Sequence, residues 1–175
     1  EATIAAKDDL DIVVGARFDQ YTRDPDGNFA TADEGFFSPR IGFSYRPDDA
    51  WQVYGNIARA FRAPSLSELY NDGVHFPLPF PPFANSFVPN PDLKPEKSTQ
   101  VEIGVRFEDR GIWRPDDQLF FGVNAYSANV EDYIDQIVGF TTTTTDNVDA
   151  YHRGLEAEAY YHPSRWFSSA SLSLP

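Results

Sequence analysis

One histidine, His75, directly precedes a segment (residues 76–83) that is rich in phenylalanine and proline. A neutral imidazole can bind haem iron as an axial ligand, and apolar rings such as those of Phe76 and Phe80 can cover a porphyrin face. Tyr70 is a weaker candidate ligand, because phenolate ligation of haem iron is rarer. The alternative is that His75 is solvated or packs at a surface, as an isolated loop histidine usually does. The residue types alone leave both interpretations open.

A pair of carboxylates, Glu156 and Glu158, is the other arrangement that could do chemistry. In an extended strand a spacing of two residues puts both on one face. Glycoside hydrolases use paired carboxylates, but two on one strand are a poor match for a cleft that must grip a sugar from both sides. The sequence has no cysteine, no glycine-rich phosphate loop and no metal-spaced histidine pair. We therefore do not expect an enzyme, and we expect no metal site beyond haem iron and no intrinsic cofactor.

The charge balance argues against one class of partner. There are 27 acidic and 14 basic residues, so the formal net charge is -13. Nucleic-acid binding needs clustered lysine and arginine, and we do not expect it here. No run of apolar residues is longer than three, which excludes a transmembrane helix. A strand that crosses a membrane needs only alternating apolar residues.

Alternation of apolar and polar residues predicts strand after strand. We predict seven strands, at residues 10–21, 38–46, 51–61, 99–108, 118–128, 150–161 and 166–174. Successive side chains of a strand point to opposite faces. The predicted apolar face, which would meet lipid, holds Ile41, Phe43, Tyr45, Val101, Ile103, Val105 and Phe107. The predicted polar face, which would line a lumen, holds Arg40, Glu102, Arg106, Glu156 and Glu158.

The connections between these strands alternate in length. Long ones (22–37, 62–98 and 129–149) alternate with shorter ones (47–50, 109–117 and 162–165), starting with a long one. Residues 141–145 read as a low-complexity loop. This asymmetry is typical of an outer-membrane barrel, although antibody-like sandwiches come close. The predicted fold is all-β, an antiparallel transmembrane β-barrel. Plugged transporters have about 22 strands, so residues 1–175 would be a fragment of a larger barrel.

Two short segments bracket the longest connection and resemble known boxes. They closely resemble the boxes on either side of a long extracellular loop in TonB-dependent outer-membrane receptors. With a histidine between them, the pattern is most similar to the haem and haemoglobin receptors of that family. The segment 154–156 also resembles the family's recurring Gly-x-Glu strand. The first box spans residues 61–70 and the second spans residues 90–98. Their motif residues are Phe61, Arg62, Ala63 and Pro64 in the first, and Asn90, Pro91, Asp92 and Leu93 in the second.

The boxes themselves are expected to have a structural role. Pro64 and Pro95 fix backbone angles where strands leave the sheet. We expect Glu68, Glu96 and Lys97 to form ion pairs at the barrel rim.

The resemblance implies a receptor of the Gram-negative outer membrane that imports its ligand with external energy. The ligand would be haem, free or delivered by a haem-carrier protein, with a ferric siderophore as the alternative. The barrel would contact lipid and lipopolysaccharide. The plug domain, and the box that contacts the TonB complex, would lie upstream of residue 1. A secreted all-β binding module is the alternative from another class.

Overall fold

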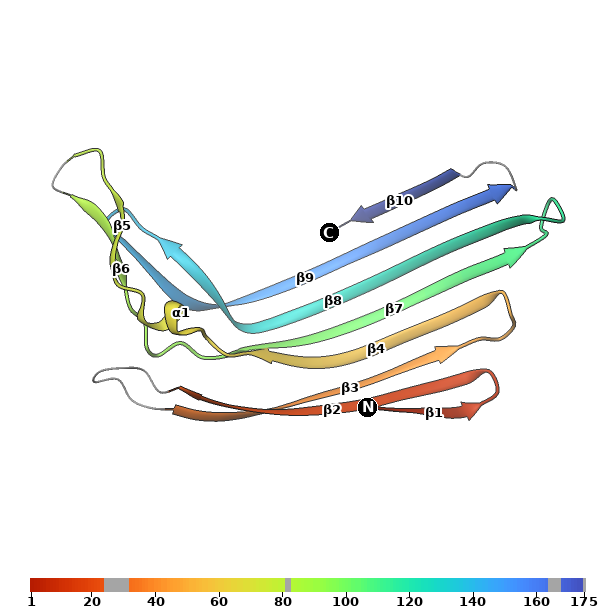
Figure 1. The fold of residues 1–175 in the computed structure, drawn as a ribbon, viewed down its shortest axis with the longest axis horizontal. Coiled ribbons are helices and arrows are strands. Elements are labelled where there is room, and N and C mark those ends of the chain that lie inside the picture. Colours follow the sequence, from red (N-terminus) through yellow and green to blue (C-terminus); the bar gives the residue numbers. More distant parts are fainter. Residues whose placement is uncertain (24–31, 81–82, 164–167, 175) are drawn as a thin grey trace.

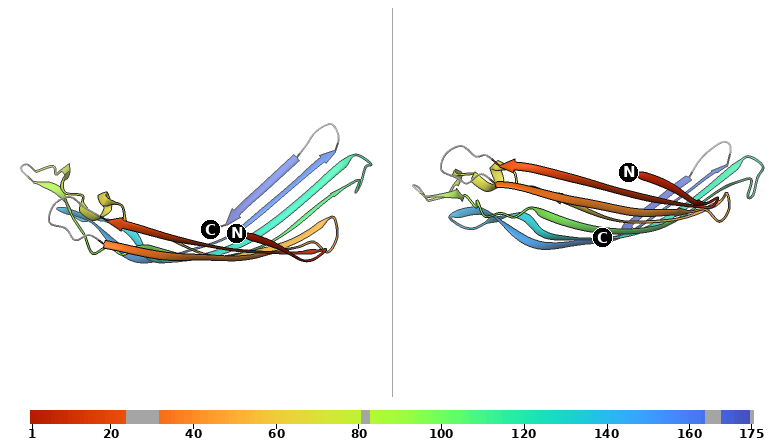
Figure 2. Two further views of the ribbon diagram at one scale, coloured as in Figure 1. Left: turned by 60° about the horizontal axis from the view of Figure 1, so that its bottom comes forward. Right: turned by 90° about the horizontal axis from the view of Figure 1, so that it is seen from below.

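The structure is a computed structural model that describes residues 1–23, 32–80, 83–163 and 168–174. Within these ranges the chain forms one ten-stranded sheet in the order β1-β2-β3-β4-β7-β8-β9-β6-β5, with β10 also paired to β9 (Figure 1). The sheet is curved and open, with β1 and β10 on opposite sides (Figure 2). An open curved wall is the form expected of part of a barrel.

Eight strands of the described ranges build this wall. All of the wall pairings are antiparallel, as predicted. The wall strands are β1 (Ala2–Lys7), β2 (Leu10–Arg23), β3 (Ala32–Tyr45), β4 (Trp51–Arg62), β7 (Glu96–Arg110), β8 (Asp117–Val138), β9 (Thr142–Pro163) and β10 (Ser168–Leu174). The segment between β4 and β7 contains α1 (Leu66–Tyr70), β5 (Gly73–Pro77) and β6 (Ala84–Val88).

One face of the wall is apolar and exposed, and we call it the apolar face. Ile103 lies opposite Gly55 of β4 and Ala125 of β8, while Phe43 lies opposite Gly55 from the other side. Ile103 is 56% exposed. Exposed apolar area of this extent marks a surface that meets lipid or another apolar partner. The predicted assignment of Ile41, Phe43, Tyr45, Val101, Ile103, Val105 and Phe107 to one face is confirmed by the register.

The opposite face is polar, and two tyrosines pack there against glycines. A Cβ added at Gly104 would overlap the Tyr54 ring, and one added at Gly154 would overlap the Tyr126 ring. Glycine is therefore needed in both strands for close packing of a ring on the backbone. The first position of the Gly-x-Glu segment is thus explained by Tyr126. The predicted polar-face residues lie on this face, where Asn56 Nδ2 donates to Glu102 Oε2 at 3.1 Å.

Short turns close one end of the wall, and aspartates shape two of them. Asp48 Oδ1 accepts from the backbone N–H groups of Ala50 and Trp51, both at 2.9 Å. Asp117 is almost fully buried, and its carboxylate accepts from backbone N–H groups 3 to 5 residues upstream, at 2.8 to 3.0 Å. The Tyr161 hydroxyl also donates to it at 2.9 Å. The longer connections lie at the opposite end, which we call the rim (Figure 1).

Several predicted boundaries were wrong, because strands run further than the alternation. The connection 129–149 is mostly strand: β8 continues to Val138, and β9 begins at Thr142 within the supposed low-complexity loop. A register shift between Val130 and Tyr133, with Asp132 at φ 56, interrupts the period of two. A bulge of this kind adds an unpaired residue without ending the strand.

The connection 62–98 is not a plain loop, because it contains α1, β5 and β6. Strand β1 was not predicted. Residues 32–37 were assigned to a loop and belong to β3. Parts of three predicted segments lie outside the described ranges. They are residues 166–167 of the strand 166–174, residues 24–31 of the connection 22–37 and residues 164–165 of the connection 162–165. Within those ranges, no helix has the length and apolar character needed to cross a bilayer.

Replacing Ile103 by arginine tests the assignment of faces. If the apolar face meets hydrocarbon, Ile103→Arg should lower the free energy of unfolding by about 2–4 kcal/mol near the midplane. Glu102→Arg places the same side chain one residue away on the polar face and should cost clearly less. Urea unfolding of the complete receptor in lipid vesicles measures both. Equal losses would contradict the face assignment.

Candidate ligand-binding site at the rim

The first box continues from β4 into the short helix α1. Ser65 is its N-cap: its Oγ accepts from the Glu68 backbone N–H at 3.3 Å, and Glu68 Oε2 accepts from the Ser65 backbone N–H at 2.8 Å. This reciprocal capping box satisfies two N–H groups that would otherwise lack partners. Pro64 precedes the cap and is buried. The sequence Pro-Ser-x-x-Glu therefore turns the chain sharply after β4 and starts a helix at once.

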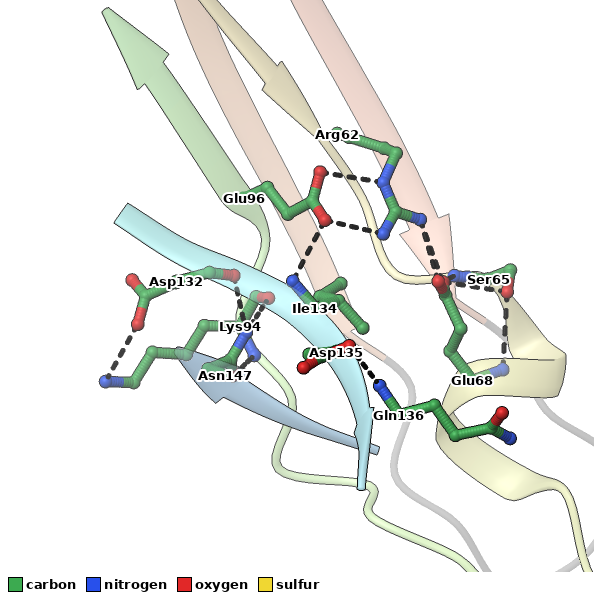
Figure 3. Close-up of polar contacts among 10 residues, drawn as sticks. All are labelled: Arg62, Ser65, Glu68, Lys94, Glu96, Asp132, Ile134, Asp135, Gln136 and Asn147. Atoms are coloured by element: carbon green, nitrogen blue, oxygen red, sulfur yellow. Dashed lines mark hydrogen bonds and ion pairs between the residues drawn. The ribbon is translucent and has the colours of Figure 1, made fainter. Parts of the chain in front are cut away.

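Arg62 joins the two boxes through two carboxylates. Its Nε and Nη2 donate to the two oxygens of Glu96 at 2.8 and 2.7 Å, and its Nη1 donates to both oxygens of Glu68 at 3.0 and 2.9 Å. Glu96 Oε1 also accepts from the Ile134 backbone N–H at 2.9 Å. One planar guanidinium thus ties β4 to α1 and β7, and Glu96 extends the link to β8 (Figure 3). Lysine could not make this forked contact.

Glu68 is held in its charged form by these contacts. Burial by itself would raise the pKa of Glu68, but hydrogen bonds from Arg62 and Ser65 outweigh it and hold the pKa below its ordinary value of 4.5. Hydrogen bonds to a carboxylate favour the charged form in this way. The contact between α1 and the end of β4 is therefore sensitive to acid.

The second box docks on the first through Asn90. Its backbone N–H donates to the Leu69 carbonyl at 2.9 Å, and its Nδ2 donates to the Thr145 carbonyl at 2.9 Å. Its Oδ1 accepts from the Asp92 backbone N–H at 3.2 Å, as asparagine does when it starts a turn. Asn90 therefore makes contacts to α1, to β9 and within its own turn.

A small apolar cluster lies where the boxes meet. Leu69 from the first box, Leu93 from the second and Ile134 from β8 are 0, 2 and 7% exposed. Tyr70 packs against them. Burial of this kind stabilises by about 25 cal/mol per Å² of apolar surface. The cluster gives each box a leucine that faces the other, which supports a structural role for both.

Asn147 of β9 holds the segment that leads into β7. Its Oδ1 accepts from the Lys94 backbone N–H at 2.8 Å, while its Nδ2 donates to the carbonyls of Lys94 at 3.0 Å and Asp132 at 2.7 Å. The Lys94 ammonium lies 3.7 Å from Asp132 Oδ1 (Figure 3). Asn147 therefore fastens the second box to the bulge in β8, the only position in the described ranges where a residue other than glycine has positive φ.

His75 lies in strand β5, within the predicted connection 62–98, and is half-buried. Its Nδ1 is 3.0 Å from Thr143 Oγ1. The ring centroids of Phe87 and Phe76 are 4.4 and 4.9 Å from the imidazole. Two aromatic contacts and one hydrogen bond fix the orientation of this ring, as a metal ligand requires.

The other predicted site residues are spread around the rim. Phe76 is next to the imidazole, whereas Phe80 is 70% exposed in the connection between β5 and β6. The Tyr70 ring packs on the apolar cluster of the boxes. Glu68 and Glu96 form the expected ion pairs with Arg62. Lys97 instead places its ammonium 5.9 Å from the Phe36 ring centroid, a cation–π contact.

Three residues near His75 were not predicted from the sequence: Phe87, Asn85 and Thr143. Thr143 was assigned to the low-complexity threonine run, and no pattern distinguished it from its neighbours. Asn85 and Thr143 are fully buried. They meet because β6 pairs in parallel with the start of β9, Ser86 opposite Thr142. The signal for this pairing is long-range and does not appear in either segment alone.

Sequence comparison matches residues 1–174 to the family described as TonB dependent receptor-like, beta-barrel. The chain is 38% identical over 147 residues to the Hemin receptor of Yersinia pestis, covering 80% of this chain and 21% of that protein. It is 36% identical to the Hemin receptor of Yersinia enterocolitica, covering 71% and 18%. The chain thus spans about a fifth of the length of these curated relatives.

Solved structures share the fold. The haemophore receptor HasR of Serratia marcescens, in complex with its haemophore HasA and haem, superimposes with a TM-score of 0.73 at 18% identity, over 94% of this chain and 29% of that one. The copper transporter OprC gives a TM-score of 0.72 at 24% identity, over 98% and 27%. The family match sets aside a secreted all-β module. The chain belongs to the β-barrel domain of the TonB-dependent receptors, which are receptors and transporters of the Gram-negative outer membrane.

Proposed function

We propose that this chain is part of an outer-membrane receptor that binds haem at its extracellular rim and admits it by energised import. The observation that carries the proposal is the His75 imidazole, oriented by Thr143 and two phenylalanine rings between the two boxes. The similarity to two proteins named Hemin receptor supports it. Long loops of such barrels lie outside the cell. A ligand that arrives from outside would therefore reach this site before it reaches the membrane.

The residues divide the work of binding. His75 would supply an axial nitrogen to the iron. Since Nδ1 is engaged by Thr143, Nε2 is the nitrogen offered to a ligand. Phe76 would contact the porphyrin beside the iron. Phe80 and Phe83, which are 70 and 64% exposed, would add apolar contact from the connection between β5 and β6.

The remaining parts of the transport cycle belong to the complete receptor. We propose that energy comes from the TonB complex through a plug domain, and that haem arrives free or on a carrier protein. The apolar face would contact lipid and lipopolysaccharide. The exposed rings at the rim support an apolar ligand or the carrier that brings it.

A ferric siderophore is the second candidate. The observation that favours a siderophore is that His75 is half-buried and hydrogen-bonded. In that case the imidazole has a structural role, packing the hairpin of β5 and β6, and does not bind iron. The exposed Phe80 and Phe83 would then grip an organic chelator without an iron–protein bond. The two candidates differ in whether iron binds a protein nitrogen.

Removing the imidazole separates these candidates. In the complete receptor, His75→Ala should change the Soret band of bound haem and weaken growth on haem, because the axial ligand sets the electronic state of the iron. His162→Ala, which removes a histidine at the short-turn end of β9, is the matched control and should change neither. Outer-membrane extraction and heat-modifiable migration check that both barrels assemble. An unchanged spectrum and unchanged growth in His75→Ala would move the siderophore to first place.

The flanking rings should matter less than the imidazole. Phe76→Ala and Phe80→Ala remove apolar contact of about 1–3 kcal/mol each and should weaken haem binding without changing the Soret band. Titration of the purified receptor with haem measures the affinity, and the spectrum is read from the same samples. A Soret shift in Phe80→Ala would contradict the division of roles.

Acid should weaken the contacts of Glu68 with Arg62 and Ser65, which hold α1 at the end of β4. Because folding lowers the pKa of Glu68, this carboxylate contributes stability that is present above its ordinary pKa and is lost as the pH falls through the lowered value. Hydrogen exchange of the Leu69 and Asn71 amides, which donate to the carbonyls of Ser65 and Ser67 at 3.2 and 3.1 Å, should therefore speed up relative to the intrinsic rate as the pH falls below the ordinary value of 4.5. Glu68→Gln should show faster exchange at neutral pH and a flatter profile. The same profile in both proteins would refute the role of Glu68.

A further inference from the structure

Asn85 has a fixed orientation that can be deduced from its partners. Its side chain is fully buried in β6. The Nδ2 lies 2.9 Å from the Gly139 carbonyl oxygen and 3.4 Å from that of Phe140. Carbonyl oxygens only accept hydrogen bonds, so the amide nitrogen must face them. The Oδ1 of Asn85 therefore faces Thr143, to which it can only act as an acceptor.

This orientation decides what the Thr143 hydroxyl does. Thr143 is fully buried in β9, and its Oγ1 is 2.7 Å from Asn85 Oδ1. A hydroxyl has one hydrogen, and that hydrogen is donated to the amide oxygen. Toward the other neighbour, His75 Nδ1 at 3.0 Å, Oγ1 can therefore only accept. The hydrogen between these two atoms belongs to the imidazole.

The tautomer of His75 follows from these two steps. A neutral imidazole carries one ring hydrogen, and here it is on Nδ1. The lone pair is then on Nε2, which has no hydrogen-bond partner among the described residues. Metal-binding histidines commonly donate their second ring N–H to an oxygen in this way, which fixes the tautomer and the ring plane.

We propose that Asn85 and Thr143 are positioning residues that hold His75 in the Nδ1–H tautomer and so present Nε2 to iron. This inference deepens the proposed haem function and depends on it for the identity of the metal. We call this chain of hydrogen bonds the relay. It begins at the Gly139 carbonyl, in the turn between β8 and β9, passes through Asn85 and Thr143, and ends at His75 on β5. The imidazole is therefore in its binding form only when the hairpin of β5 and β6 is docked on that turn.

The docking that builds the relay is a short parallel ladder. Ser86, Phe87 and Val88 pair with Thr142, Thr143 and Thr144, and the Thr144 hydroxyl donates to the Val88 carbonyl at 3.0 Å. These contacts fasten the hairpin without help from the Thr143 hydroxyl. Removing that hydroxyl alone should therefore release the tautomer while leaving the hairpin in place.

The tautomer can be read without any ligand. In the complete receptor labelled with ¹⁵N-histidine, the His75 signals are those lost in His75→Ala. Wild-type His75 should show a protonated Nδ1 and an unprotonated Nε2. Thr143→Val keeps the shape but removes the acceptor, and it should shift His75 toward the Nε2–H form. Thr143→Ser restores a hydroxyl and should restore the wild-type pattern.

Haem titration of the same proteins supplies the second readout. Thr143→Val should bind haem about 10-fold more weakly, the usual size of such an outer-shell effect, and should shift the reduction potential of the bound iron. Thr143→Ser should stay near the wild-type values for both. A wild-type His75 that carries its hydrogen on Nε2, or a Thr143→Val receptor with an unchanged tautomer, would overturn the relay.

The two hypotheses fail in different ways. An unchanged Soret band in His75→Ala would refute the haem function, while the ligand-free spectra still decide whether the relay sets the tautomer. A changed Soret band in His75→Ala, together with Thr143→Val that matches wild type in tautomer, affinity and potential, would refute the relay alone.

Discussion

The continuous pairing of backbones across the wall is the constraint on which the rest of the structure depends. A strand in a bilayer must satisfy its N–H and C=O groups through its neighbours, because hydrocarbon offers no partners. Strand β4 pairs with β7 along its whole length, from Trp51 opposite Phe107 to Arg62 opposite Glu96, and with β3 over residues 53–58. A slip of one residue would exchange the apolar and polar faces. The same register also places Arg62 beside Glu96, so the rim contacts are set by the wall.

Above the wall, charge and apolar burial have different roles. The Arg62 side chain is 45% exposed, and exposed ion pairs contribute little to stability. Its value is geometric, because the planar fork determines where α1 begins relative to β7. The burial of Leu69 and Leu93 supplies the apolar contact that holds the boxes together. The imidazole is then oriented by contacts from β6 and β9 that the boxes do not make themselves.

The sequence was sufficient for the parts of the fold that are periodic. Alternation around Phe43 and Ile103 predicted the strands and their faces, and the turn of Asp48 was readable from its composition. The bulge at Asp132 broke the period, so the rim halves of β8 and β9 read as a loop. The boxes indicated the family and pointed to His75. Its hydrogen-bond partner could not be found, because Thr143 is one of several similar threonines and meets His75 only through the pairing of β6 with β9.

One edge of β9 is shared by two partners of opposite direction. Near the short-turn end β10 pairs with it in antiparallel fashion, from Ser168 opposite Tyr161 to Leu174 opposite Leu155. At the rim β6 takes the same edge, in parallel, up to Val88 opposite Thr144. A strand that extends the wall along β9 must therefore stop short of Thr144. The hairpin of β5 and β6 therefore occupies the rim end of this edge, so that the length over which the wall can continue along β9 is set by the same pairing that brings Thr143 to His75.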